Sequence, residues 1–132
     1  MFILSWKPGA LAAWPGPYLV SATRFTYRRL VHMPGVFWNG MALRAMWPAF
    51  AGGVGVSLRG DLRTRSTYTV SVWRSPEDLR AFVGHPKHLS LMKRYGSRLE
   101  SSASVTWTTD RIELRELWSL AKQKVAGIPS DG

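Results

Sequence analysis

Strand-like patterns occur in four segments of the chain. Residues 18–27 are dense in β-branched and aromatic side chains, which suit a pleated, half-buried surface. Residues 66–73 and 102–109 alternate apolar with small polar positions, as strands with two different faces do. Residues 54–59, followed by a charged, turn-forming stretch at 60–65, are expected to form a hairpin with the strand at 66–73.

Three helical segments separate or follow these strands. Apolar residues recur near helical spacing over residues 36–50, and Pro48 is expected to end that helix. Ser75-Pro76-Glu77-Asp78 is a strong helix start, because serine caps the backbone N–H groups and the carboxylates favour the positive end of the dipole. Gly84-His85-Pro86 then interrupts this helix, which resumes over residues 88–95.

The chain ends in a further helix. Asp110 followed by Glu113 resembles a capping box, and residues 111–125 carry apolar side chains at docking positions. Residues 128–132 are a polar tail. The glycine-rich stretch at 52–55 lacks the strand and helix context of a nucleotide-binding turn, so a loop is expected there.

The order of these elements predicts a ferredoxin-like α+β fold, βαββαβ, with an extra C-terminal helix. The domain is expected to span residues 18–127, preceded by an extended N-terminal arm at residues 1–17 that is rich in Pro, Gly and Trp. Helices are expected to cover one face of the sheet. The other face would carry Thr69, Ser71 and Trp73, with Trp107 as a further candidate, and a second subunit would cover it.

Composition narrows the class of protein. The chain has 132 residues, of which 45% are apolar, enough for one folded domain. The absence of cysteine excludes disulfides and thiolate sites. No apolar run reaches about 18 residues, and the N-terminal stretch lacks the pattern of an export signal. A cytoplasmic protein with no membrane partner is therefore expected.

The formal net charge of +10 allows a nucleic-acid partner, an anionic membrane surface or an anionic small molecule. The basic residues are spread over every predicted element, however, and do not gather in one tail or on one helix face. That distribution is more typical of a solvated basic surface, so nucleic-acid binding is the less favoured interpretation.

One stretch resembles a known family. Residues 68–94, from Tyr68-Thr-Val-Ser-Val-Trp73 through Ser75-Pro-Glu-Asp78 to the His88 region, are similar to a strand and helix of the monooxygenase-type dimeric α+β barrels. The resemblance is to the antibiotic-biosynthesis-monooxygenase-like group and, more distantly, to spheroidene monooxygenase. It implies a homodimer, with a cavity between sheet and helices that binds an apolar or aromatic small molecule. Some of these families oxidise substrates without a cofactor, whereas other barrels of the superfamily bind heme.

The resemblance singles out His88 as the candidate catalytic residue. Imidazole titrates near neutrality and binds iron, so His88 could be a general base, a proton shuttle or an axial heme ligand. The alternative is that it caps or packs the helix that resumes after Pro86. His85 lies three residues earlier, but Pro86 spoils the geometry of a shared metal site, and no metal site is expected. His32 is expected in a loop.

The candidates for lining the substrate cavity are Trp38, Asn39, Trp73 and Trp107, since indole offers a large apolar surface with one donor. Each could equally belong to the core, as is expected of Trp47 and Trp118. Arg24 is the first choice among Arg24, Arg44, Arg59 and Arg65 for holding an anionic group of a ligand.

Three functions remain open from the sequence. The first is a monooxygenase-like enzyme that oxidises an apolar or aromatic metabolite, with no cofactor required and heme possible. The second is a non-catalytic module, either a ligand- or heme-binding barrel or a basic nucleic-acid binder. The third is a subunit of a biosynthetic assembly, for which the N-terminal arm would be the contact.

Overall fold

The computed structural model describes residues 2–128, so most of the predicted tail lies outside the described residues. The strands are β1 (Phe2–Pro8), β2 (Tyr18–Tyr27), β3 (Gly53–Asp61), β4 (Ser66–Trp73) and β5 (Leu99–Thr109). The helices are α1 (Met33–Ala45), α2 (Pro76–Val83), α3 (Pro86–Tyr95) and α4 (Leu114–Ala126). Short 3-10 turns occupy Leu30–His32, Trp47–Ala49 and Gly96–Arg98.

The strands form one antiparallel sheet in the order β1-β3-β4-β2-β5. Strands β2 to β5, with α1 between β2 and β3 and with α2 and α3 between β4 and β5, give the ferredoxin-like connectivity. The predicted ferredoxin-like α+β fold with an additional C-terminal helix is therefore confirmed.

Strand β1 extends the sheet beyond the four predicted strands. Residues 2–8, which the sequence indicated as part of an extended arm, pair antiparallel with β3 at the edge of the sheet. The Gly9 N–H then donates to the Val54 carbonyl at 2.9 Å, so the pairing continues past the end of β1. The extended conformation is as expected, but the first half of the arm is a strand of the domain because the free edge of β3 offers unpaired backbone groups.

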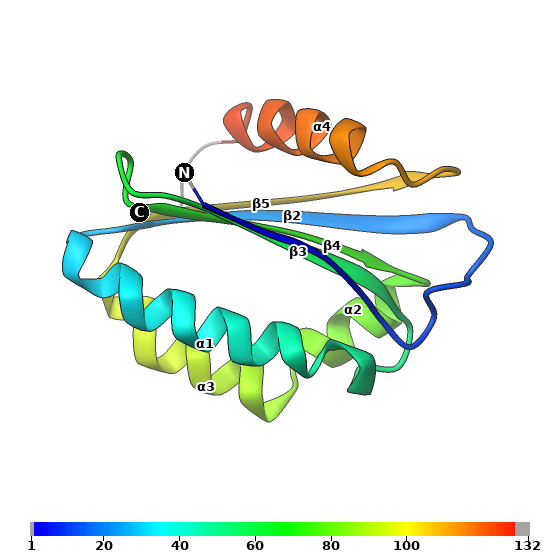
Figure 1. Ribbon diagram of the computed structural model, residues 1–132, viewed down its shortest axis with the longest axis horizontal. Coiled ribbons are helices and arrows are strands. Elements are labelled where there is room, and N and C mark those ends of the chain that lie inside the picture. The colour runs from blue at the N-terminus through cyan, green and yellow to red at the C-terminus, as the bar shows by residue number, and fades with distance from the viewer. Residues whose placement is uncertain (1, 129–132) are drawn as a thin grey trace.

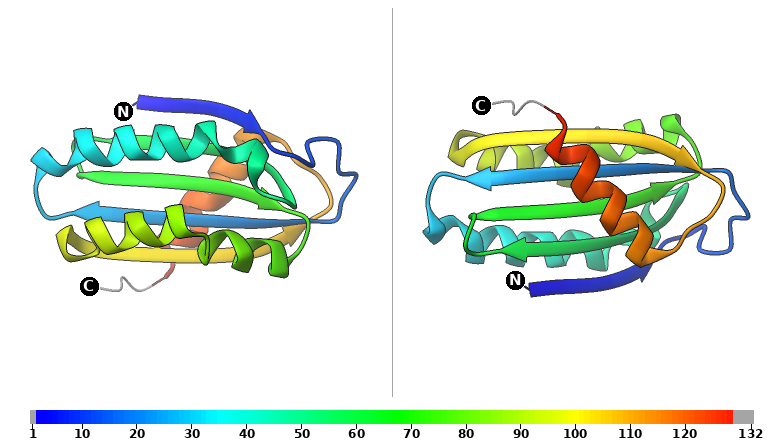
Figure 2. Two further views of the ribbon diagram at one scale, coloured as in Figure 1. Left: turned by 90° about the horizontal axis from the view of Figure 1, so that it is seen from below. Right: turned by 90° about the horizontal axis from the view of Figure 1, so that it is seen from above.

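Helices cover both faces of the sheet. Helices α1, α2 and α3 lie on one face, and α4 crosses the other face diagonally (Figures 1 and 2). Under α4, a core is built from buried small and β-branched residues of the sheet together with the inner side of the helix; it includes Val20, Ala22, Val70, Val72, Leu117 and Trp118. Trp118 donates from Nε1 to the Ser57 hydroxyl at 3.3 Å, and its buried position confirms the prediction for this residue.

The two faces are assigned in the opposite way to the prediction. Thr69, Ser71 and Trp73 face α1, α2 and α3, not a partner subunit, and Trp73 is completely buried. Trp107 lies on the other face and packs against the core under α4, with Lys124 Nζ 5.4 Å from its ring. The prediction failed because helices of one chain cover both faces: α1, α2 and α3 lie over the face with Trp73, and α4 lies over the valine-rich face with Trp107 (Figure 1).

Several element ends differ from the sequence expectation. Helix α1 begins at Met33, three residues earlier than expected, and ends at Ala45, and Pro48 sits in the following 3-10 turn. Glu113, not Asp110, caps α4 by accepting hydrogen bonds from two backbone N–H groups. Residues 53–55 belong to β3 and not to a loop, because the β1 edge and β4 pair with them on either side.

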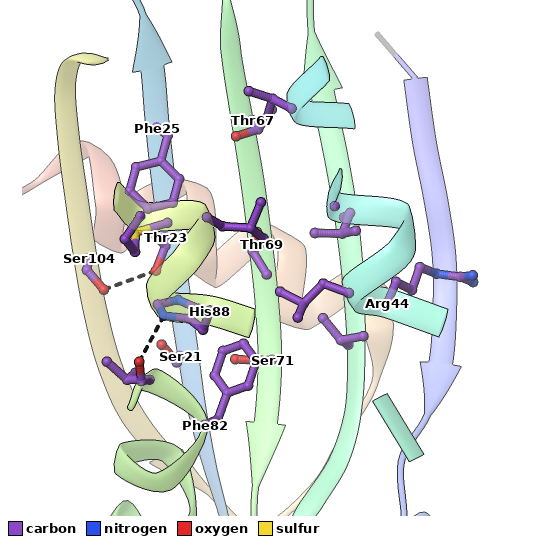
Figure 3. Close-up of a pocket in the computed structure, with 18 of the residues that line it drawn as sticks. Ser21, Thr23, Phe25, Arg44, Thr67, Thr69, Ser71, Phe82, His88 and Ser104 are labelled. Carbon is purple, nitrogen blue, oxygen red and sulfur yellow. Dashed lines mark hydrogen bonds between the residues drawn. The ribbon is translucent and has the colours of Figure 1, made fainter. Parts of the chain in front are cut away.

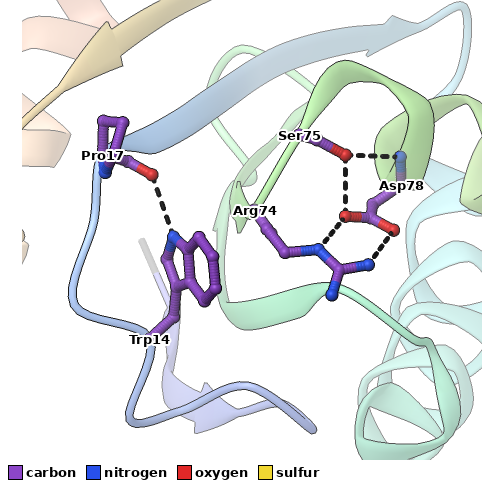
Figure 4. A network of polar contacts seen from close by, with 5 residues as sticks. All are labelled: Trp14, Pro17, Arg74, Ser75 and Asp78. Atoms are coloured by element: carbon purple, nitrogen blue, oxygen red, sulfur yellow. Dashed lines mark hydrogen bonds and ion pairs between the residues drawn. The ribbon is translucent and has the colours of Figure 1, made fainter.

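The start of α2 and the break before α3 follow the sequence closely. Ser75 caps α2 by accepting from the Asp78 N–H, and Arg74 makes a two-pronged ion pair with the Asp78 carboxylate at 2.9 and 3.1 Å (Figure 4). His85 ends the break by accepting from the Lys87 N–H. Within residues 2–128, none of the helices combines the length and hydropathy needed to cross a bilayer.

Candidate functional site

A cavity of about 390 Å³ lies between the sheet and the layer formed by α1, α2 and α3. Its sheet wall carries short hydroxyl side chains, among them Ser21, Thr23, Thr67, Thr69, Ser71 and Ser104 (Figure 3). Its helix wall is apolar and includes Val36, Phe37, Leu43, Phe82, Leu91 and Met92. The volume is in the range of small-molecule sites in proteins.

The sheet wall exists because alternate residues of β2, β4 and β5 point to the same face. Neighbouring hydroxyls satisfy each other in part: Thr23 and Ser104 are 3.1 Å apart, and the Tyr27 and Thr67 hydroxyls are 3.3 Å apart. These side chains are short, so the large residues of the helices do not close the gap above them. The helix wall is thus an apolar roof over the cavity. The sheet wall is its floor, with groups that can donate or accept hydrogen bonds.

His88 is the residue of the cavity lining best suited to acid–base chemistry. Helix α3 places it beside the end of α2, where its Nδ1 lies 3.0 Å from the Val83 carbonyl oxygen (Figure 3). A carbonyl can only accept, so Nδ1 carries the proton and Nε2 keeps its lone pair. Burial lowers the pKa of His88 below its ordinary value, although the Val83 carbonyl opposes this shift. At neutral pH the imidazole is thus a neutral base.

A cluster of aromatic rings packs against the His88 imidazole. The His88 ring centroid is 4.8 Å from that of Phe82, whose ring in turn contacts Trp47, Phe50 and Trp73 at 4.9 to 5.2 Å. Trp47 is buried, as the sequence predicted. The Trp73 indole donates to the Ser71 hydroxyl at 2.9 Å, which fixes one hydroxyl of the floor. The cluster holds both the base and part of the floor in place.

The other predicted cavity residues of α1 lie elsewhere. Trp38 is 73% exposed on the outer side of α1 and does not contribute to the cavity wall. Asn39 donates to the Gly35 carbonyl at 2.8 Å and to the Tyr95 hydroxyl at 3.1 Å, and it lines a separate groove between α1 and α3. Neither residue lines this cavity, because the rotation of α1 turns Phe37 and Gly40 toward the sheet instead.

The predicted strand residues also lie outside the cavity lining. Trp73 packs beneath the cavity in the aromatic cluster, and Trp107 and Arg24 point to the face that α4 covers. Arg24 lies opposite Tyr68 of β4, which packs against the core under α4. The alternation of a strand separates its two faces but does not say which face a cavity will use.

The sequence reasoning missed the hydroxyl floor and Phe82. The signal was present: serine or threonine occupies alternate positions over residues 67–71 of β4 and 102–108 of β5 and recurs at Ser21 and Thr23 of β2. In the sequence alone, this pattern indicates a strand face that contacts solvent or a second subunit. Small polar side chains facing bulky apolar helices instead leave a cavity.

No group of three or more metal-binding side chains occurs within residues 2–128. The side chains that line the cavity suit a heme only in part. His88 Nε2 could serve as an axial ligand. Heme also carries two propionates, which need cationic partners. Of the two arginines along the wall, Arg44 already donates to the Ser5 carbonyl at 2.8 and 3.2 Å, and the Arg59 guanidinium lies over Trp118 on the far face. The cavity lining therefore does not fit a heme with both propionates paired.

No protein-family model matches the chain, and no curated protein matches it. Solved structures do. A dimeric ferredoxin-like protein of unknown function from Thermobifida fusca superposes with a TM-score of 0.61 at 16% identity, over 71% of this chain and 92% of that one. A Nitrosomonas europaea protein, provisionally described as an antibiotic biosynthesis monooxygenase, gives 0.64 at 8% identity, over 71% of this chain and 91% of that one.

A variant of SnoaB, a cofactor-independent oxygenase from Streptomyces nogalater, gives a TM-score of 0.57 at 21% identity, over 75% of this chain and 98% of that one. At such identities the likeness concerns the fold. It agrees with the resemblance found in the sequence, and a further neighbour, from Bacteroides fragilis, is also described as a dimeric protein of ferredoxin-like fold. The chain thus has the ferredoxin-like α+β fold that these solved structures share.

Proposed function

We propose that the cavity binds an apolar or aromatic metabolite and that His88 initiates its oxidation by molecular oxygen, with no cofactor required. The observation that carries this proposal is the state of His88: a neutral imidazole whose Nδ1 is committed to the Val83 carbonyl while the side chain lines an apolar cavity. The description of SnoaB as a cofactor-independent oxygenase supports the reaction class.

The chemistry needs a substrate with an acidic C–H beside an aromatic carbonyl or phenol. Nε2 of His88 takes that proton, and the charge that develops on the substrate oxygen is stabilised by hydroxyls of the floor. The carbanion then passes one electron to O₂, and the two radicals combine to a hydroperoxide. Loss of water leaves a carbonyl, so a CH₂ group and O₂ become C=O and H₂O.

The residues around His88 favour this order of events. The apolar roof keeps water from protonating the carbanion, because Phe82, Leu91 and Met92 cover the cavity on the helix side. Phe82 also desolvates the imidazole, which keeps it neutral. The same site without turnover would be a ligand-binding protein, so the assay must separate binding from oxidation.

Oxygen uptake with anthrone, a tricyclic ketone with an acidic CH₂, tests the proposal. The protein is expected to bind anthrone and convert it to anthraquinone with one O₂ consumed per product. His88→Gln is expected to lower kcat/KM by about 10²- to 10⁴-fold, the usual contribution of a general base. His85→Gln is the matched control, because His85 caps α3 outside the cavity lining and should leave the rate nearly unchanged.

Rate against pH gives a second readout. Because burial lowers the pKa of His88, the fall of kcat/KM in acid should be displaced to lower pH than an ordinary imidazole would give. Binding of anthrone without oxygen uptake would contradict oxidation. Equal rates for the wild type and His88→Gln would remove His88 from the reaction.

We also propose that the protein works as a homodimer, as two of the structural neighbours are described as dimeric. Light scattering at micromolar concentration tests this. A monomer would contradict the proposal for the assembly but not for the cavity, since the cavity residues named above all come from one chain.

A further inference from the structure

The outer side of α1 is an exposed stripe without a single polar side chain. Six exposed residues form it along the length of the helix and its approach: Val31, Pro34, Trp38, Met41, Ala42 and Ala45. Steps of three or four residues, with Met41 and Ala42 adjacent, keep them on one side of the helix. Val31 and Trp38 are 72% and 73% exposed, so the two largest groups at the start of the stripe project into solvent.

The inner side of α1 is apolar as well, because Val36, Phe37 and Leu43 face the cavity. Asn39, the one polar residue of α1 besides Arg44, is held by the Gly35 carbonyl and the Tyr95 hydroxyl, and a helix so largely apolar is normally buried on more than one side. In α1 the only charged residue is Arg44, whose guanidinium is held by the Ser5 carbonyl. The stripe is therefore expected to bind an apolar environment that residues 2–128 do not supply.

The segments that carry α1 and α3 hold charges of one sign, and the acids of the neighbouring α2, Glu77 and Asp78, are paired with Arg80 and Arg74. Residues 28–50 contain three arginines, and residues 84–99 contain four lysines and arginines, but neither segment contains an aspartate or a glutamate. Lys87 and Arg94 of α3 are exposed and line the groove beside α1 together with Ala42 and Met46. Helices α1 and α3 lie side by side on this face (Figure 2).

We propose that this face docks on an anionic membrane surface, with the α1 stripe in the headgroup region and the flanking cations on the lipid phosphates. Exposed tryptophan and aliphatic side chains next to lysine and arginine are what interfacial binding requires. This differs from the sequence expectation of no membrane partner, which rested on the absence of a spanning segment. Surface docking needs no such segment.

Other occupants fit the stripe less well. A second copy would bring two cationic faces together, which is repulsive. Single-stranded nucleic acid needs several aromatic platforms for its bases, and Trp38 is the only aromatic residue of the stripe. A specific protein interface carries about one hydrogen bond per 100–200 Å², and the stripe side chains offer none except the Trp38 indole.

Co-sedimentation with vesicles tests the proposal on the full chain. Vesicles of phosphatidylcholine and phosphatidylglycerol in about a two-to-one ratio should bind the protein at least tenfold better than phosphatidylcholine alone, and added salt should weaken the binding. Trp38→Ser should lower the partition coefficient by roughly tenfold or more, since a large apolar side chain is withdrawn from the interface. Leu62→Ser is the control, because Leu62 is exposed in the β3–β4 turn outside the stripe.

Charge is tested by two matched double variants. Lys87→Glu with Arg94→Glu should reduce binding to the anionic vesicles by about tenfold or more. Arg115→Glu with Lys122→Glu makes the same change of net charge on exposed residues of α4, on the other side of the sheet, and should have a much smaller effect. A melting curve for each variant checks that it is folded.

Three results would overturn the proposal: equal binding to neutral and anionic vesicles, equal losses for the stripe and control variants, or a Trp38→Ser defect seen only with single-stranded RNA or with an acidic protein. The vesicle assay contains no cavity ligand and measures no oxidation. Its failure therefore leaves the proposed oxidation untouched, and failure of the anthrone assay leaves the docking proposal untouched.

Discussion

Replacing Phe82 with alanine is expected to weaken the fold and the candidate base together. The Phe82 ring lies within 5.2 Å, centroid to centroid, of four other rings: Trp47, Phe50, Trp73 and His88. Truncation of a core phenylalanine costs about 3–5 kcal/mol, and Phe82 is only partly buried, so about 3 kcal/mol is expected. That is a large share of the roughly 5–15 kcal/mol that stabilises a typical domain.

Urea unfolding followed by tryptophan fluorescence measures the loss. With a slope of roughly 1–3 kcal/mol per molar, the midpoint should fall by about 1–3 M. Phe82→Leu is the matched variant: it keeps an apolar side chain of similar reach and should cost less than about 1.5 kcal/mol.

The second readout is the pKa of His88, followed by NMR titration of the imidazole protons. In the wild type, burial holds this pKa below its ordinary value. Removal of the Phe82 ring admits water to the imidazole, so the pKa should rise in Phe82→Ala and less so in Phe82→Leu. An unchanged pKa in Phe82→Ala, or a loss of stability below about 1 kcal/mol, would refute the view that this cluster supports the base.

Three further predictions concern the frame around the site. Ser57→Ala leaves the buried Trp118 indole N–H without its acceptor and should cost about 1–3 kcal/mol in chemical unfolding; an effect near zero would contradict the hydrogen bond. Gly55→Val should displace the Trp6 ring, which occupies the space of a Cβ there, and hydrogen exchange in β1 should accelerate while α4 stays protected. Arg74 lowers the pKa of Asp78, so Asp78 stabilises the fold above its unfolded pKa and this contribution is lost as the pH falls through the depressed value. In Asp78→Asn, the free energy of unfolding should therefore fall less steeply as the pH is lowered. An unchanged acid dependence would exclude Asp78 as its source.

Local signals were sufficient for most of the secondary structure. The capping serine at residue 75, the proline after the break at Gly84-His85 and the alternation of residues 66–73 each depend on neighbours in the sequence, and the structure places elements where they indicated. Strand β1 escaped prediction because its partner is β3, some 50 residues away. An edge strand is defined by its hydrogen bonds to that partner, and the pattern of residues 2–8 alone does not show them.

For the candidate site, His88 was found because the resemblance pointed to it, and the structure places it in the cavity wall. The indoles were chosen for their chemistry, and chemistry alone does not say which way a side chain points. The rotation of α1 determines that Trp38 points to solvent, and the position of α4 determines what Trp107 packs against. Both depend on packing between distant segments.

By itself, the sequence determined the order of the ferredoxin-like elements and the alternation that gives β2, β4 and β5 one apolar and one hydroxyl-bearing face. Only the tertiary structure decided which layer of helices each face would meet. The bulky side chains of α1, α2 and α3 lie over the hydroxyls and leave a cavity, whereas α4 closes tightly over the valines. The reason is physical: alternation along a strand is fixed by local backbone geometry, but the assignment of its faces depends on the apolar surface that all the helices together must bury.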